Sequence, residues 1–285
     1  MAPWLPGLAR CSACGTAVTL AAPPGPEAYE TGSPRLGRLV APVLARFDRR
    51  RLSFLNAPRG TLLDVGAGRG RFVAAALRAG WAARGIEPSE RGVSAAASAY
   101  GVALERGGVA DAGGSHDAVV LWHVLEHLDD PNAVVAQLAS LVAPGGRLLI
   151  GVPNLASVQA RLGGLRWFHL DLPRHRTHFT PAGLRALLER HGFVIEREEH
   201  ALLEHNPFGL WQTLVNRFTR TPSWLFRALK RDAPLLHTDA LVTLLFLSFA
   251  PLALVAERVF AALHRGGTIA VVARLRPTAA QPSQR

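Results

Sequence analysis

Leu62-Leu63-Asp64-Val65-Gly66-Ala67-Gly68-Arg69-Gly70 places three glycines at alternate positions directly after an apolar run. Glycine has no Cβ and adopts positive φ without steric cost, so a turn of this kind brings the backbone close to a ligand. The apolar run before the turn predicts a buried strand, and the residues that follow it predict a helix. The stretch therefore predicts a strand–loop–helix unit with a ligand at its loop.

The spacing of the glycines distinguishes between classes of ligand. A nicotinamide dinucleotide site has the spacing G-x-G-x-x-G, and a phosphate-binding loop ends in Lys followed by Ser or Thr. Neither pattern is present here, because the spacing is G-x-G-x-G and no lysine follows. Asp64 lies two residues before the first glycine, where a carboxylate disfavours a pyrophosphate and favours a positive amine. The methionine end of S-adenosylmethionine carries such an amine.

Strand and helix patterns alternate around this unit, which predicts an α/β fold with a doubly wound parallel sheet. The ligand of such a sheet lies at the carboxyl ends of the strands. Glu87 ends the next strand, where a carboxylate can accept hydrogen bonds from both hydroxyls of a ribose. The predicted strands are 61–65, 82–87, 102–105, 117–122, 147–152, 193–198 and 268–274, and the predicted helices are 35–56, 69–79, 89–100, 132–141 and 180–191.

The chain divides into four parts by composition and pattern. Residues 1–34 hold many prolines and no periodic pattern, so they are interpreted as a loose leader with a lone Cys-x-x-Cys pair, Cys11 and Cys14. A structural zinc site needs four ligands, so this pair alone predicts no metal. Residues 35–199 and 267–276 form the main α/β domain, residues 200–266 form a helical, apolar insertion before the last strand, and residues 277–285 form a disordered tail.

Five stretches in order resemble the class I S-adenosylmethionine-dependent methyltransferases, in the bacterial branch similar to ubiquinone-biosynthesis O-methyltransferases. They are "LLDVGAGRG", "GIEPS", "DAVVLWHVLEHLDDP", "LVAPGGRLLIGVPN" and "LPRHRTHFTPAGLRALLERHGF". The resemblance implies a seven-stranded, mostly parallel sheet whose last strand, residues 268–274, is antiparallel. It also implies that S-adenosylmethionine is the cofactor.

The resemblance assigns cofactor-binding roles to residues that match the motifs. Asp64 and the loop residues Gly66, Ala67, Gly68 and Gly70 would line the methionine and ribose side, and Glu87 would hold the ribose hydroxyls. Asp111, or the backbone beside it, would meet the adenine. Trp122 occupies the family's position just after the fourth strand.

Four residues are candidates for catalysis, namely His123, Glu126, His127 and His178. Methyl transfer requires alignment of the acceptor and removal of its proton, and histidine is suited to that removal near neutral pH. The sequence hypothesis is that His127 or His178 is the general base for a hydroxyl acceptor. If residues 123–127 are helical, His123, Glu126 and His127 share one face. The alternative is that Glu126 and His127 only brace the loop through hydrogen bonds.

The same residues have a metal-binding alternative. The metal-dependent small-RNA 2′-O-methyltransferases place Glu-x-x-Glu-His and a later His around Mg²⁺. Here His123 replaces the first Glu, while Glu126, His127 and His178 match. Three imidazoles and one carboxylate suit zinc or iron better than Mg²⁺, which prefers oxygen ligands. The sequence interpretation assigns no metal to this set.

Charge and hydropathy bear on partners. The formal charge is +11 and is carried almost entirely by arginine, which favours anionic partners such as an anionic membrane surface. No signal peptide pattern begins the sequence, so a cytoplasmic protein is expected.

The apolar run 240–256 is short for a membrane span, and the strands on either side of the insertion should pair in one sheet. Two interpretations stay open for residues 200–266. They form either a hairpin at the inner membrane face, inserted through Trp211, Trp224 and Phe226, or a lid or dimer surface.

The expected function is transfer of a methyl group to an oxygen or nitrogen of a small-molecule or lipid- or glycan-linked acceptor. One alternative is a non-catalytic cofactor-binding scaffold, which the intact Asp64, glycines and Glu87 disfavour. The other is a metal-assisted RNA 2′-O-methyltransferase. A nucleic-acid partner is disfavoured because the sequence shows no stacking platform for bases. The oligomeric state is not predicted.

Overall fold

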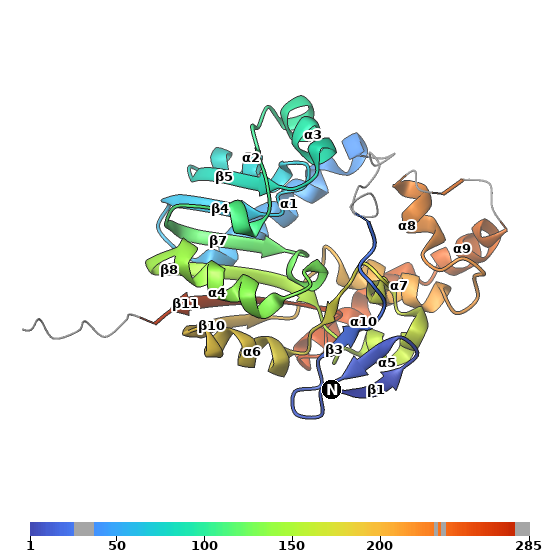
Figure 1. Cartoon of the computed structure of the whole chain (residues 1–285). Helices are drawn as coiled ribbons and strands as arrows, with labels where there is room; N and C mark the ends of the chain where they lie inside the picture. The colour runs from blue at the N-terminus through green and yellow to red at the C-terminus, as the bar shows by residue number, and fades with distance from the viewer. Residues whose placement is uncertain (26–36, 231–232, 235–237, 277–285) are drawn as a thin grey trace, which may run out of the picture.

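The computed structural model describes residues 1–25, 37–230, 233–234 and 238–276, which form two sheets and flanking helices (Figure 1). The large sheet has the strand order β10-β11-β8-β7-β4-β5-β6. β11 runs antiparallel to both of its neighbours, and the pairs among β8, β7, β4, β5 and β6 are parallel. The predicted fold class is therefore confirmed. The strands are β4 (Thr61–Val65), β5 (Ala82–Glu87), β6 (Glu105–Arg106), β7 (His116–Trp122), β8 (Val142–Pro153), β10 (Phe193–Glu199) and β11 (Thr268–Leu275).

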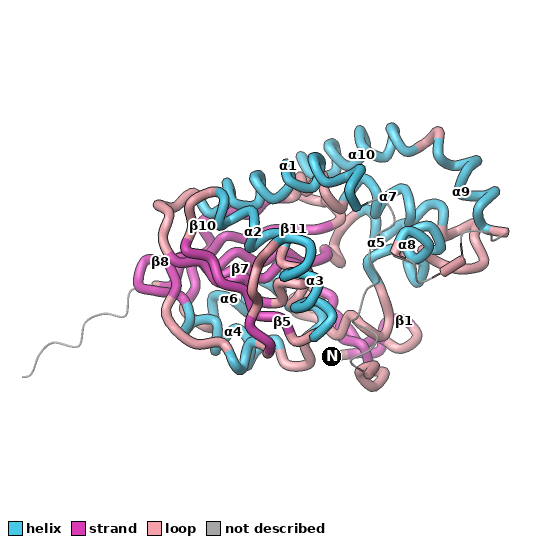
Figure 2. Tube along the Cα trace, turned by 90° about the horizontal axis from the view of Figure 1, so that it is seen from above, coloured by secondary structure: helices cyan, strands magenta, loops and turns pink. Residues whose placement is uncertain are grey.

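Helices cover both faces of this sheet, as Figure 2 shows. One face is packed by Phe54 and Leu55 of α1 and by Phe72 and Ala76 of α2. The other face is packed by helices that follow β7 and precede β10, through Leu138 and Leu184. Burial of these apolar side chains on both faces is what a parallel sheet requires. The helices are α1 (Gly37–Leu55), α2 (Arg71–Arg78), α3 (Glu90–Tyr100), α4 (Pro131–Leu141) and α6 (Pro181–Arg190).

Side-chain caps fix where three of these helices begin. Ser89 Oγ accepts a hydrogen bond from Gly92 N, and Thr180 Oγ1 accepts one from Gly183 N, so both predicted caps are confirmed. Asp130 caps α4 in the same way through Asn132 N and Ala133 N. One predicted strand was misplaced. Residues 102–104 pack Val102 and Leu104 against α2 and α3, and pairing with β5 begins only at Glu105.

The N-terminal residues are not a loose leader over the part that the structure describes. β1 (Ala2–Leu5), β2 (Leu8–Arg10) and β3 (Ala17–Thr19) form an antiparallel sheet with β9 (Thr177–His178). Leu8 and Ala17 are buried against Leu155 and Trp167. The prediction was wrong because strands of three or four residues are too short to show alternation. Residues 26–34 of the predicted leader and the predicted tail 277–285 lie outside the described residues.

The Cys-x-x-Cys pair lies in the turn between β2 and β3. Cys11 N donates to Thr16 O, and Gly15 N donates to Cys11 O. Both thiols are free in the structure. The turn contacts the start of α6, because Thr180 Oγ1 donates to Cys14 O. The pair therefore belongs to the N-terminal sheet and not to an unstructured leader.

The insertion between β10 and β11 is helical in its described part, as predicted. It comprises α7 (Asn206–Val215), α8 (Trp224–Leu229), α9 (Asp239–Leu247) and α10 (Ala250–Ala262). α7 packs on α10 through Leu210, Trp211 and Ala253. Glu257 of α10 is buried and accepts a 2.6 Å hydrogen bond from Gln159 Nε2. Gln159 belongs to α5 (Val158–Gly163), a short helix in the connection after β8, so this hydrogen bond joins the insertion to that connection. Burial raises the pKa of Glu257 to about 7.

Candidate active site

The glycine loop lies at the carboxyl end of β4 and is attached to β5. Gly66, Gly68 and Gly70 all have positive φ, at 72°, 57° and 73°. Gly66 N and Ala67 N both donate to Ile86 O, which fixes the loop over the sheet edge. A Cβ on Gly66 would meet Val124 at 2.5 Å, and one on Gly70 would meet Ala96 at 2.7 Å. A Cβ on Gly68 would meet nothing within 4 Å, so this residue borders open space where a ligand can lie.

Asp64 is buried at the end of β4, beneath this loop. Burial raises its pKa to about 7, and the nearby carboxylates of Asp48 and Glu87 act in the same direction, whereas Arg51 and Arg71 act against it. A carboxyl group of this kind is poised to be ionised by a cationic ligand. The position fits the amino group of a methionine moiety better than it fits a phosphate.

Arginines and carboxylates form a network around Asp64. Arg71, the first residue of α2, lies 2.9 Å from Glu204 Oε1 and 3.2 Å from Asp48 Oδ1. Arg51 of α1 lies 2.9 Å from Glu204 Oε2. Glu204 precedes α7, so the network joins the helix after the glycine loop to the insertion. Burial acts to raise the pKa of Glu204, but His205 and the two arginines outweigh it and hold this pKa well below its usual range.

Glu87 ends β5 with both carboxylate oxygens engaged by the loops around it. Oε2 accepts from Gly68 N at 2.8 Å, and Oε1 accepts from Ser89 N at 2.9 Å. Burial raises the pKa of Glu87, and these two backbone hydrogen bonds oppose the shift. Each oxygen retains acceptor capacity, so the residue is placed to bind a diol next to the glycine loop.

The other two predicted cofactor residues have local partners. Asp111 is exposed in a short 3-10 turn, and its carboxylate accepts from Gly108 N at 2.9 Å. Trp122 ends β7, where its indole Nε1 donates to His205 Nε2 at 3.2 Å and the Arg51 guanidinium lies 4.1 Å from its ring centre. Their assignment to the cofactor site stays a prediction.

His123 and Glu126 meet directly after β7, at the same edge of the sheet as the glycine loop. His123 has a φ of 55°, and its Nδ1 donates to Glu126 Oε1 at 3.0 Å. Glu126 is 1% exposed. Burial acts to raise its pKa, but the hydrogen bond from His123 and the nearby imidazoles outweigh it and lower the pKa to about 2. The carboxylate is therefore ionised and orients the imidazole. The condition for a shared helical face is not met, since residues 125–127 form only a 3-10 turn.

The remaining predicted catalytic residues, His127 and His178, differ in their surroundings. His127 Nδ1 donates to Arg174 O at 3.1 Å. His178 is buried in β9, the last strand of the N-terminal sheet, where its Nε2 lies 3.0 Å from Thr19 Oγ1. Burial and neighbouring His175 lower the pKa of His178 to about 3. His178 is thus a poor general base, and its hydrogen bond to Thr19 supports the loop.

Three further histidines of the cluster were not among the predicted site residues. His169 and His205 flank the His123 ring, with ring centres 6.2 Å and 4.3 Å away. His175 lies 4.6 Å from His127, ring centre to ring centre. His169 and His175 belong to the loop after β8, and His205 begins the insertion. The stretch "LPRHRTHFTPAGLRALLERHGF" contains His175 and pointed to this loop, but no sequence signal pointed to His205.

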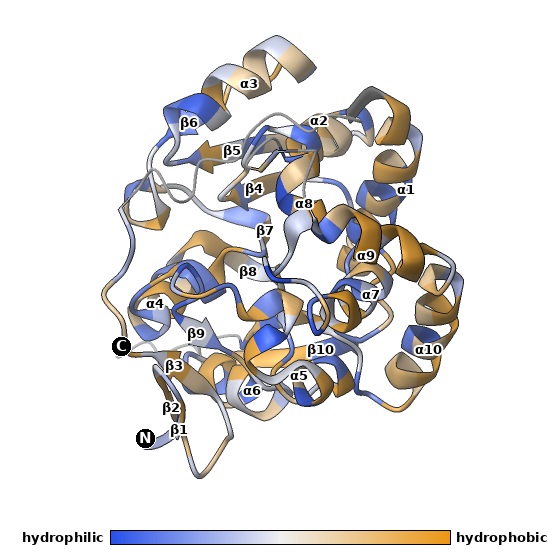
Figure 3. Cartoon of the chain, turned by 90° about the vertical axis from the view of Figure 1, so that its right-hand side faces the viewer, coloured by the Kyte–Doolittle hydropathy of each residue, from blue (hydrophilic) through white to orange (hydrophobic). Residues whose placement is uncertain are grey.

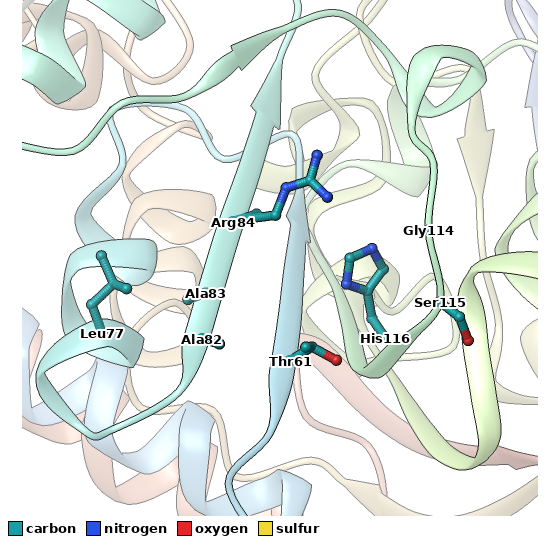
Figure 4. Close-up of a pocket in the computed structure, with 8 residues that line it drawn as sticks. All are labelled: Thr61, Leu77, Ala82, Ala83, Arg84, Gly114, Ser115 and His116. Atoms are coloured by element: carbon teal, nitrogen blue, oxygen red, sulfur yellow. The ribbon is translucent and has the colours of Figure 1, made fainter.

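A shallow pocket lies at the opposite edge of the sheet from this cluster (Figure 4). It is lined by Thr61, Ala82 and His116, which are the first residues of β4, β5 and β7. Ligands of doubly wound sheets lie at the carboxyl ends of the strands. This pocket is therefore not the cofactor site.

Comparison with known proteins agrees with this geometry. Residues 39–198 match the family model described as "Methyltransferase domain". A ubiquinone biosynthesis O-methyltransferase of Caulobacter vibrioides is 28% identical over 203 residues, covering 66% of this chain and 77% of the relative. The protein of the same name from Xanthomonas axonopodis is 30% identical over 173 residues, covering 54% and 72%.

Solved structures share the fold at low identity. A putative methyltransferase in complex with the Trm112 methyltransferase activator of Haloferax volcanii has a TM-score of 0.52 and 16% identity, covering 86% of this chain and 99% of the other. The [4+2]-cyclase SpnF has a TM-score of 0.51 and 20% identity, covering 81% and 80%. At these identities the likeness concerns the fold alone.

Proposed function

Because the chain belongs to the class I S-adenosylmethionine-dependent methyltransferases, we propose that it methylates an oxygen or nitrogen of a small-molecule or lipid-linked acceptor. The loop of residues 66–70 with Asp64 and Glu87 fits S-adenosylmethionine, which supplies a methyl group on a sulfonium. In the transfer, the sulfur–methyl bond breaks as the bond from methyl to the acceptor atom forms. The acceptor loses one proton, which the protein must take up.

The pair of His123 and Glu126 carries this proposal. Glu126 holds His123 Nδ1 as a donor, so the lone pair of the imidazole is on Nε2. His123 Nε2 is buried and has no hydrogen-bond partner among the described residues. The residue lies between the loop after β8 and the insertion, which contribute His169 and His205 beside its ring. We assign His123 as the general base, in preference to His178.

The surroundings of this pair favour an acceptor with apolar character. Phe168, in the loop after β8, packs on Phe208 of α7 and Phe226 of α8 with ring centres 5.4 Å and 5.2 Å away. Trp167 lies edge-on to His169. The loop after β8 and the insertion therefore place a cluster of aromatic side chains next to His123. Such a cluster favours an acceptor whose hydroxyl or amine is attached to an apolar molecule.

The proposed activity is tested with methyl-labelled S-adenosylmethionine and a lipid extract, a polar metabolite extract and total RNA from bacterial cells. We expect label in the lipid or small-molecule fraction, together with S-adenosylhomocysteine formed in equal amount. Donor binding without transfer to any fraction would indicate a scaffold. Transfer to RNA alone would contradict the proposed acceptor class.

We further propose that the insertion contacts an anionic membrane surface. Large apolar residues of α9 and α10 are each more than half exposed, among them Leu241, Leu244, Leu252, Val255 and Val259. In Figure 3 the ribbons of α9 and α10, which lie next to each other, are largely in the hydrophobic colour. Exposed apolar side chains in such number on two successive helices mark an interaction site, and arginines nearby in the sequence favour anionic headgroups.

Arginines accompany this apolar surface along the chain. Arg217, Arg227, Arg258 and Arg265 are exposed in or beside the insertion. In Figures 2 and 3, α1 lies on the same side of the molecule as α9 and α10. α1 adds exposed Leu39 and Val43 there, followed by exposed Arg46 and Arg49. No single described helix is long and apolar enough to cross a bilayer. Taken together, α9 and α10 are long and apolar enough, but the two helices are bent by 67° relative to each other.

Flotation with vesicles tests the membrane contact. We expect the protein to float with vesicles containing anionic lipid at low salt, and the double substitution L244E/L252E to reduce the floated fraction at least about tenfold because charge in the apolar contact is costly. The control L77E/Y100E adds the same charge at exposed positions of α2 and α3 and should float like the wild type. Failure to float at low salt, or formation of a dimer that L244E/L252E disrupts, would contradict membrane contact.

A further inference from the structure

Glu126, His127 and His175 converge at one point beside the proposed base. One ligand atom from each lies within 4.8 Å of the other two. Glu126 and His127 belong to the 3-10 turn after β7, and His175 belongs to the loop before β9. The set therefore forms only when the loop after β8 folds back over the edge of the sheet. Arg176 N donates to Glu126 O at 2.7 Å and holds that loop in place.

The two imidazoles of this set are oriented by backbone carbonyls. His127 Nδ1 donates to Arg174 O at 3.1 Å, and His175 Nδ1 donates to His169 O at 2.8 Å. A carbonyl oxygen can only accept, so in both rings the proton is on Nδ1 and the lone pair is on Nε2. Metal-binding histidines show this arrangement, in which the outer nitrogen donates to a carbonyl and fixes the tautomer.

One carboxylate oxygen of Glu126 has no hydrogen-bond partner among the described residues. Glu126 Oε1 accepts from His123, but Oε2 is buried and has no hydrogen-bond partner among the described residues. An ionised carboxylate oxygen in this position is costly unless a cation or a donor satisfies it. A metal ion between Oε2 and the two imidazoles would supply that charge.

His178 is not part of the set, although the sequence motif favours it. Thr19 Oγ1 donates its single proton to His175 O at 2.6 Å. The same hydroxyl can therefore only accept from His178 Nε2, 3.0 Å away. His178 thus fixes Thr19, and Thr19 fixes the backbone of His175. The rings of His175 and His178 are 6.4 Å apart.

We propose that Glu126, His127 and His175 bind one divalent ion of the kind that accepts imidazole ligands, such as Zn²⁺, Fe²⁺ or Co²⁺. Two histidines and one carboxylate leave coordination positions open. A hydroxyl acceptor bound at an open position would lose its proton more readily, since the ion acts as a Lewis acid. That use rests on the proposed methyl transfer, whereas binding of the ion does not. This proposal departs from the expectation of no metal from the sequence.

The test uses full-length protein freed of metal by chelation and titrated with Co²⁺, whose visible absorption reports coordination. We expect one Co²⁺ per chain with d–d bands, displaced by one equivalent of Zn²⁺ and not by Mg²⁺. E126Q and H175A should each weaken Co²⁺ binding at least about 100-fold, because loss of a ligand exceeds the 10- to 100-fold effect of an outer contact. E126Q is nearly isosteric and guards against failure of H175A to fold.

Two controls distinguish this site from others. H191N removes a half-buried histidine outside the set, at the end of α6, and should leave Co²⁺ binding unchanged. H178N should reduce Co²⁺ binding by less than about tenfold. Binding of S-adenosylmethionine, measured by calorimetry on the same samples, reports the cofactor site separately, so failure of the proposed function would be visible on its own. The proposal is overturned if Co²⁺ binds weakly without d–d bands, or if H178N abolishes binding while H175A retains it.

Discussion

Replacement of Asp64 by asparagine is expected to weaken binding of S-adenosylmethionine about 100-fold. The carboxyl group is buried at the end of β4, beneath the glycine loop. In our account it pairs with the amino group of the donor, and loss of a charged partner in a desolvated site costs roughly 2–5 kcal/mol. Titration calorimetry at pH 7.5 measures the effect. The control D117N changes a carboxylate at the opposite end of the neighbouring strand, where it accepts from Thr61, and should leave affinity unchanged.

The raised pKa of Asp64 gives this binding a pH dependence with a definite sign. With a pKa of about 7, the carboxyl group is largely protonated at pH 6 in the ligand-free enzyme. Binding of an ammonium group requires its ionised form, so affinity should fall as the pH decreases below 7, by up to tenfold per unit. The neighbouring Asp48 and Glu87 raise this pKa, and Arg51 and Arg71 lower it. D64N should lose the dependence.

Replacement of His123 by asparagine is expected to lower kcat about 10²- to 10⁴-fold, the range for loss of a general base. Asparagine is the matched choice because it tolerates the left-handed φ of 55° at this position. The Kd for S-adenosylmethionine should change less than threefold. Turnover of the acceptor found with the labelled donor, alongside calorimetry, measures both quantities.

E126Q and H191N extend this experiment. E126Q keeps an oxygen for His123 Nδ1 but loses the charge, so a smaller decrease in kcat of about tenfold or more is expected. H191N should turn over like the wild type, since the His191 imidazole contacts Asn132 of α4 and none of the candidate site residues. Wild-type turnover in H123N with intact donor binding would show that His123 is not the base.

The positions of the candidate cofactor residues could be predicted from the sequence because each lies at or near the end of a strand with a clear local pattern. Asp64, the loop glycines and Glu87 lie at the ends of two adjacent parallel strands, so local pattern and strand order together place them. The lengths of the apolar runs likewise predicted where most strands begin and end, and the caps Ser89 and Thr180 predicted where two helices begin. These features require no knowledge of which distant segments touch.

The acceptor side could be predicted only in part, because it is built by contacts between distant segments. His205 meets Trp122 across 83 positions, and Thr19 meets His178 across 159. The N-terminal strands are three or four residues long and gain stability by pairing with β9, which no local pattern reveals. Residues 123–127 are not α-helical, because His123 has a left-handed φ and residues 125–127 form a 3-10 turn, so the condition for a shared helical face is not met. The choice of His175 over His178 follows from hydrogen bonds that only the folded loop provides.

The central claim is that a buried aspartate under the first loop recognises the charged amine of the methyl donor. Calorimetry of S-adenosylmethionine binding in two buffers of different ionisation enthalpy tests it, with D64N subtracted to cancel the titration of the donor itself. Our account predicts release of close to one proton at pH 6 and almost none at pH 8, from a pKa of about 7. Equal heats in both buffers at pH 6, with the same affinity in D64N, would contradict it.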